Sequence, residues 1–83
     1  MNRQEREQTI ANIIRIYKAF KNQPMNHRQI YHHIGEYQEQ ISPCVTSKIV
    51  LSMYQDGLLE VVHVGSRFTD YRLTEKGIAK GVA

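Results

Sequence analysis

Apolar residues recur at steps of three and four along the first quarter of the chain, which is the pattern of an amphipathic helix. The stripe is formed by Ile10, Ile13, Ile14, Tyr17 and Phe20. It predicts a first helix over residues 4–22. The run Asn22-Gln23-Pro24 should end it, because proline cannot continue the helical hydrogen-bond ladder and pushes the residue before it out of the helical region.

Residues 26–56 predict two further helices. Asn26 and Gln29 have the spacing of a capping box at the start of the second helix. Ser42 before Pro43 is the start signal of the third, a capping hydroxyl with proline at the first helical position, and this helix should run to about residue 55. Its expected inward face consists of Val45, Thr46, Ile49, Val50 and Met53. Residues 36–40 either lengthen the second helix or form a turn, and we treat them as a connector.

The last third of the chain predicts a β-hairpin over residues 58–74 and a short tail over residues 75–83. Residues 58–64 are rich in β-branched side chains, residues 71–74 alternate large and polar ones, and Gly65 lies in the intervening loop. Thr74 can cap a last helix, which Gly77 and Gly81 weaken. The expected fold class is therefore α+β, in one domain.

Size and composition limit the classes of function. A chain of 83 residues buries a single small core, which leaves little room for a deep cavity, so we expect no enzyme. One cysteine, no long apolar run and no basic-then-apolar start indicate a reducing, cytoplasmic location with no membrane segment. The net charge of +3 is compatible with an anionic partner without requiring one.

Three helices followed by a hairpin form the element order of a winged helix-turn-helix. The closer match is carried by Asp56-Gly57-Leu58-Leu59 and by the stretch from Tyr71 to Gly77. Over residues 25–81 the chain resembles prokaryotic winged helix-turn-helix transcriptional regulators, closest to small PadR-like and MarR-like proteins. The resemblance implies that the third helix enters the DNA major groove and that the hairpin wing lies on the backbone or minor groove. The connector departs from the family, since it adds Glu36 and Glu39 near the expected DNA side.

Candidate contacts to double-stranded DNA are the polar and basic side chains on these elements. They are Arg28, Ser42, Thr46, Ser47, Lys48, Gln55, Arg67 and Arg72. The first turn of a helix offers free amides to a phosphate, whereas Lys48 and Arg67 supply charge. Both are also residues that any exposed helix or loop carries. Leu51 either contacts a thymine methyl or belongs to an apolar partner surface.

Metal, cofactor and effector sites are not indicated. His27, His32, His33 and Cys44 suggest zinc ligands, but a spacing of five does not put two imidazoles on one helix face. Cys44 as a redox sensor is an alternative to a small space-filling residue, which we favour. We expect no small-molecule effector, because MarR-like ligand pockets lie between helices that this chain largely lacks.

The length of the first helix suggests a homodimer through Ile10, Ile13 and Tyr17, since a small core would leave part of that stripe uncovered. A second function stays open. It is a winged-helix module for protein interaction, such as an accessory or inhibitory factor. The single lysine on the third helix, the acidic connector and the mild net charge favour it.

Overall fold

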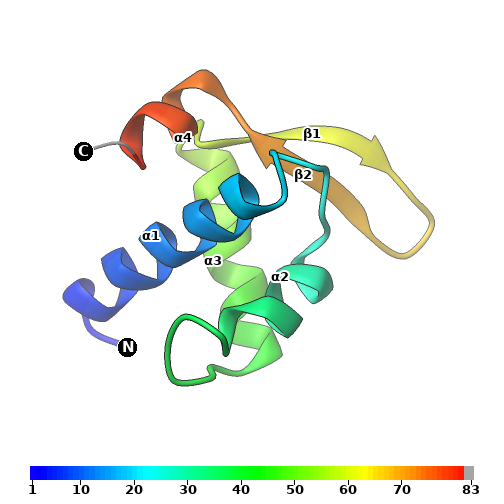
Figure 1. The fold of residues 1–83 in the computed structure, drawn as a ribbon. Coiled ribbons are helices and arrows are strands. Elements are labelled where there is room, and N and C mark those ends of the chain that lie inside the picture. The colour runs from blue at the N-terminus through cyan, green and yellow to red at the C-terminus, as the bar shows by residue number, and fades with distance from the viewer. Residues whose placement is uncertain (82–83) are drawn as a thin grey trace.

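The computed structural model describes residues 1–81, in which the helices pack beneath a two-stranded sheet that projects beyond them (Figure 1). The elements are α1 (Arg3–Ala19), α2 (His27–Ile34), α3 (Pro43–Gln55), β1 (Leu59–Val64), β2 (Thr69–Leu73) and α4 (Glu75–Lys80). This order confirms the predicted α+β class, with a hairpin after three helices and a short helix after the hairpin. Part of the predicted tail, residues 82–83, lies outside the described residues.

Helix α1 ends three residues earlier than the sequence pattern predicts. Lys21 and Asn22 have φ values of 55° and 59°, a left-handed conformation that helix geometry excludes. The backbone N–H of Asn22 donates to the Tyr17 carbonyl at 2.7 Å, which supplies one of the helix-end carbonyls with a partner. The chain therefore turns sharply here and approaches the hairpin.

The helix starts agree with the capping signals in the sequence. Asn26 and Gln29 form a complete capping box at α2. The Ser42 hydroxyl accepts from the Val45 N–H at 3.1 Å at the start of α3. No helix within residues 1–81 is long and apolar enough to span a membrane.

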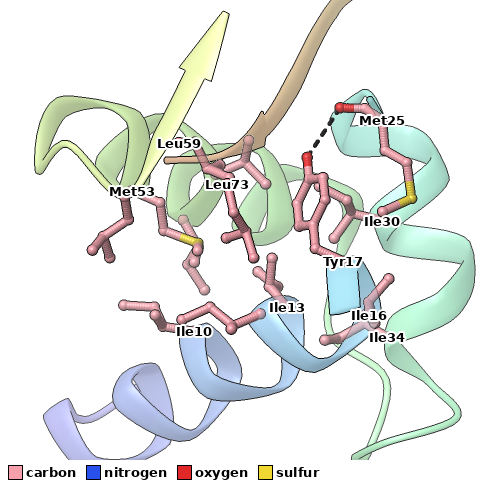
Figure 2. Packing of buried hydrophobic residues seen from close by; sticks show 14 residues of the cluster. Ile10, Ile13, Ile16, Tyr17, Met25, Ile30, Ile34, Met53, Leu59 and Leu73 are labelled. Atoms are coloured by element: carbon pink, nitrogen blue, oxygen red, sulfur yellow. Dashed lines mark hydrogen bonds between the residues drawn. The ribbon is translucent and has the colours of Figure 1, made fainter. Parts of the chain in front are cut away.

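The core is one cluster drawn from all three main helices and from the base of the hairpin (Figure 2). Ile13 and Tyr17 are fully buried and Ile10 is 2% exposed, among side chains that include Met53, Leu59 and Leu73. These three α1 residues cannot form the interface between two copies, so that prediction is wrong. Helices α2 and α3 and the hairpin base cover this stripe as far as Tyr17, whereas Phe20 stays 42% exposed.

Tyr17 links α1 to the hairpin through its hydroxyl group. The hydroxyl oxygen lies 2.9 Å from the Tyr71 carbonyl and 3.2 Å from the Met25 carbonyl, and it donates to this pair. Met25 and Tyr71 also exchange two backbone hydrogen bonds of 2.9 Å. Burial raises the pKa of the Tyr17 hydroxyl, and the negative charge of Asp70 adds to this shift.

We expect Tyr17→Phe to lower the free energy of unfolding by about 1 kcal/mol at pH 7, because a buried hydrogen bond is lost with little change of shape. The wild-type advantage should shrink above pH 10. The unfolded chain releases the Tyr17 proton near pH 10.0 whereas the folded chain retains it, so the wild type loses stability as pH rises. Urea unfolding of both proteins at pH 7 and pH 10.5 tests this. A difference that grows with pH would contradict it.

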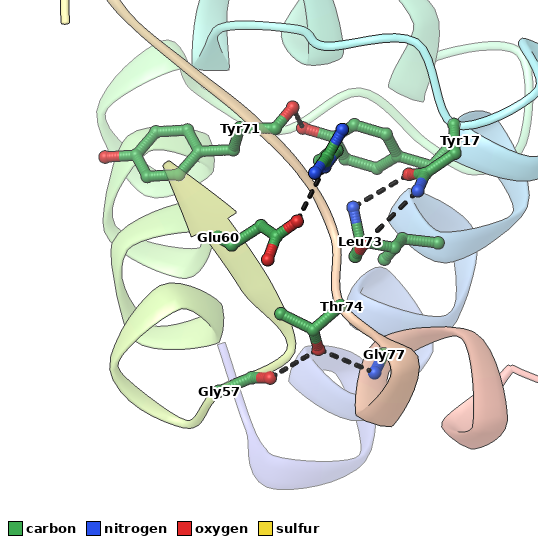
Figure 3. Close-up of polar contacts among 9 residues, drawn as sticks. Tyr17, Gly57, Glu60, Tyr71, Leu73, Thr74 and Gly77 are labelled. Atoms are coloured by element: carbon green, nitrogen blue, oxygen red, sulfur yellow. Dashed lines mark hydrogen bonds and ion pairs between the residues drawn. The ribbon is translucent and has the colours of Figure 1, made fainter. Parts of the chain in front are cut away.

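The outer edge of β2 is paired by residues that are not part of a strand. The Asn22 side-chain amide accepts from the Leu73 N–H at 2.8 Å and donates to the Leu73 carbonyl at 3.1 Å (Figure 3). Together with the Met25–Tyr71 pair, this carboxamide continues the backbone ladder for one more step. The hairpin is thus fixed to the end of α1 along one edge.

Helix α4 is fixed to the base of the hairpin by hydrogen bonds of Thr74 and by close backbone contact at Gly77. The Thr74 hydroxyl donates to the Gly57 carbonyl at 2.6 Å and accepts from the Gly77 N–H at 3.1 Å (Figure 3). A Cβ atom on Gly77 would overlap the Leu58 carbonyl oxygen, so only glycine fits at this position. The glycine that weakens α4 as an isolated helix is what lets it pack here.

Candidate nucleic-acid interface

Helix α3 presents one solvent-facing surface along its whole length. Ile49, Val50 and Met53 are at most 5% exposed and face the core. The exposed residues of α3 are Pro43, Cys44, Lys48, Leu51, Tyr54 and Gln55, with Ser47 half-buried at the margin. From Cys44 onward they recur at helical spacing on the side opposite the core. The predicted contacts Ser47, Lys48 and Gln55 therefore lie on a surface that a partner can reach.

Thr46 does not belong to this surface. Its side chain is fully buried and its hydroxyl donates to the Ser42 carbonyl at 3.0 Å. Thr46 lies on the same core-facing side of α3 as Val50 and Met53. The prediction that it contacts DNA is therefore wrong. Ser42 stays exposed, although its hydroxyl oxygen already accepts the capping hydrogen bond from Val45.

Three exposed cations lie on three different elements. Arg28 is in the first turn of α2, Lys48 is in the middle of α3, and Arg67 is in the wing loop. Within residues 1–81 none of them has a carboxylate oxygen within 4.0 Å of its charged nitrogens. Their charge is therefore available to an anionic partner.

Arg72 differs from these three cations. Its Nε atom lies 2.6 Å from a carboxylate oxygen of Glu60, directly across the hairpin. Glu60 largely neutralises the charge of Arg72, so Arg72 attracts a phosphate less strongly than the sequence alone suggests. The same outward face of the wing holds a second pair, His63 with Asp70 at 3.7 Å.

Arg6 joins the basic groups beside α3 and was not found by sequence reasoning. Its guanidinium donates to the Ser52 hydroxyl at 2.7 Å, and it lines a surface hollow together with Lys48. Glu7 lies 3.8 Å away, a longer contact than the one to Ser52. Since Arg6 and Ser52 are 46 residues apart, no local pattern in the sequence indicates this contact.

The connector over residues 36–40 folds back onto α1. The Gln38 side chain donates to the Thr9 hydroxyl at 3.0 Å and accepts from the Asn12 amide at 2.8 Å. Figure 1 shows this loop beside α1, away from the wing. Glu36 lies 3.8 Å from the His33 ring. The insertion is therefore a turn docked on α1, with Glu36 and Glu39 exposed.

The wing is a twisted hairpin with an irregular strand. Pairing of β1 with β2 shifts register between Val61 and His63, which leaves Val62 as a bulge. Val61 before the bulge and Val62 within it are each about two-fifths exposed. Val64, beyond the bulge, is 72% exposed. Apolar side chains thus extend along β1 towards the tip of the wing.

Aromatic contacts tie the wing to the helices on either side. The Tyr71 ring packs against Tyr54 of α3 with a centroid distance of 5.8 Å. At the tip, the Phe68 ring lies 5.7 Å from the His27 ring of α2. The wing, α2 and α3 therefore form one continuous surface.

The candidate metal ligands do not gather. Residues 1–81 contain no group of three His, Cys, Asp or Glu side chains placed to hold a metal ion. Cys44 is exposed and carries a free thiol in the first turn of α3.

The comparisons with known proteins concern the fold. No family model matches the chain, and no curated protein does. A search of solved structures finds H. salinarum RosR, a winged-helix protein, with a TM-score of 0.74 and 20% sequence identity. The superposition covers 89% of this chain and 66% of the RosR chain, so this chain spans just under two thirds of that protein. The fold is a winged helix-turn-helix, and the PadR-like or MarR-like grouping stays a prediction.

Proposed function

We propose that this protein is a DNA-binding transcription regulator that lays the exposed face of α3 in the major groove and the wing on the neighbouring backbone. The observation that carries the proposal is the placement of Arg28, Lys48 and Arg67. Each is exposed, and among the described residues each lacks a carboxylate partner. They lie on α3 and on the two elements beside it, α2 and the wing.

The likeness to RosR, a winged-helix regulator, supports DNA binding in general. Residue roles rest on the surface chemistry of this chain alone. Lys48 is a point charge suited to a phosphate or a guanine edge, Gln55 suits the backbone, and Leu51 suits a thymine methyl. We further propose a cytoplasmic, non-enzymatic role.

We expect Lys48→Ala/Arg67→Ala to weaken binding to a random-sequence duplex and to reduce its salt dependence. Loss of two phosphate contacts should lower the slope of log affinity against log salt by about 1.8. Fluorescence anisotropy with a labelled duplex across a salt series measures both quantities.

The matched control is Arg15→Ala/Lys18→Ala, which removes the same net charge from exposed positions on α1. If the control lowers the slope as much as the test variant, binding reflects net charge and the α3 interface is wrong. If the wild type does not bind even at low salt, the proposal fails altogether.

A homodimer stays part of the proposal, with an interface outside the buried α1 stripe. A two-fold dimer should recognise half-sites about 10 base pairs apart, or a multiple of that spacing. Sedimentation equilibrium at tens of micromolar tests it directly, and a monomer would contradict it.

The protein-interaction module is a second candidate because of one observation. Leu51 and Tyr54 on α3 and Val64 on β1 are 48%, 44% and 72% exposed, an apolar content that phosphate contacts do not need. This candidate predicts no salt-dependent affinity for duplex DNA, so the same titration separates the two functions.

A further inference from the structure

A hollow of about 310 Å³ lies where the start of α2, the start of α3 and the wing tip meet. Its wall is mostly apolar and consists of His27, Arg28, Tyr31, His32, Pro43 and Phe68. These residues come from segments up to 41 positions apart in the chain, and the sequence gives no signal that they meet. The hollow adjoins the first turn of α3, next to the surface proposed to bind DNA.

Local structure holds the rings of this hollow in place. His27 and Tyr31 are four residues apart, so they lie on one face of α2. Phe68 reaches them because the wing loop closes through a hydrogen bond of 2.8 Å from the Gly65 N–H to the Phe68 carbonyl. A Cβ atom on Gly65 would come within 2.9 Å of that carbonyl oxygen, so glycine permits the tight loop.

The hollow combines apolar rings with one available cation. Phe68 and Tyr31 are partly buried, which leaves ring surface open to a ligand. Arg28 is exposed at the rim and, within the described part of the chain, has no carboxylate within 4.0 Å. A ligand that fits has an apolar body and an anionic group beside it.

We propose that this hollow binds one sugar-phosphate unit of the DNA backbone, with Arg28 on the phosphate and Phe68 and Tyr31 against the deoxyribose. The inference rests on the proposed DNA-binding function and extends it from charge to ring contacts. A deoxyribose carries apolar carbons next to a phosphate, which matches the chemistry of the wall. A free phosphate ion would leave the rings unused.

The two kinds of contact have different salt signatures. Arg28→Ala should lower the slope of log affinity against log salt by about 1, because one phosphate contact is lost. Phe68→Ala should weaken binding about three- to tenfold at every salt concentration and leave the slope unchanged, because apolar burial releases no counterion. Anisotropy titrations of a random-sequence duplex measure both effects on the full chain.

Matched variants keep the test decisive. Arg28→Lys should retain the slope, and Lys18→Ala and Tyr37→Ala are controls for an exposed cation and an exposed ring elsewhere. Thermal unfolding checks that each variant folds.

If Arg28→Ala and Phe68→Ala bind like the wild type while Lys48→Ala/Arg67→Ala binds more weakly, the hollow does not contact DNA, although the proposed DNA binding stands. If Phe68→Ala lowers the slope by about 1, as the loss of one phosphate contact would, the ring only holds the wing, and the ring contact is wrong. A wild type that does not bind DNA overturns the proposed function itself.

Discussion

Asn22→Ala is expected to lower the free energy of unfolding by about 3 kcal/mol. Its carboxamide makes two hydrogen bonds to the Leu73 backbone, of 2.8 and 3.1 Å, and their loss should cost about 1 kcal/mol each. A further ~1 kcal/mol arises because alanine at a φ of 59° is strained. A domain of this size has a total stability of about 4–12 kcal/mol, so the loss is a large fraction of it.

Urea unfolding of Asn22→Ala and Asn22→Gly separates the two causes. Glycine accepts the left-handed conformation but lacks the amide, so Asn22→Gly should lose about 1 kcal/mol less than Asn22→Ala. Equal losses would mean that the backbone conformation contributes nothing. A loss below 1 kcal/mol in both would show that the pairing with Leu73 does not stabilise the hairpin base.

Gly77→Ala is expected to lower the free energy of unfolding by about 2 kcal/mol, although alanine is the better helix former. The added methyl group would overlap the Leu58 carbonyl oxygen and press on the Leu73 side chain. Either α4 or the start of β1 must then move, at a cost typical of overpacking. Thermal unfolding followed by circular dichroism measures the change.

The control for Gly77→Ala is Ala79→Gly, at an exposed position of the same helix. It changes only helix propensity and should cost at most about 1 kcal/mol. If Gly77→Ala stabilises the protein, propensity governs α4, and its close packing against the hairpin base is unimportant.

Sequence signals were sufficient wherever the cause is local. Ser42 with Pro43 and Asn26 with Gln29 start helices at the expected residues, because a cap acts within one turn. The hairpin likewise follows from β-branched residues before a glycine-containing loop and from alternating large and polar residues after it. The end of α1 was misjudged, since the periodicity continues to Phe20 while the backbone turns at Lys21.

Contacts between distant segments explain the errors. The sequence alone left the α1 stripe without a neighbour because part of its cover, β2, lies more than 50 residues further along the chain, as the hydrogen bond from Tyr17 to Tyr71 illustrates. The sequence predicts Thr46 both on the inward face of α3 and as a DNA contact, and its burial confirms only the inward position. The sequence does not indicate a role for the Phe68 ring, because only folding brings it next to His27.

Part of the candidate site could be predicted from the sequence, because the charge of a lysine or arginine side chain depends less on tertiary packing than its burial does. Arg28, Lys48 and Arg67 could be selected from their elements alone, and each is exposed. Arg72 could not be discounted from sequence, since its pairing with Glu60 depends on the strand register. A one-residue shift in that register would place the two side chains on opposite faces of the sheet.

The unequal edges of the hairpin bear on self-association between copies. The edge of β2 is closed by Met25 and by the Asn22 side chain, whereas β1 has no strand on its outer side within residues 1–81. An open, β-branched edge is a template for strand addition. The bulge at Val62 interrupts the regular spacing of backbone donors and acceptors along the β1 edge, so a second strand cannot pair with this edge in one continuous register. The irregularity thereby disfavours edge-to-edge pairing of the wings of two copies.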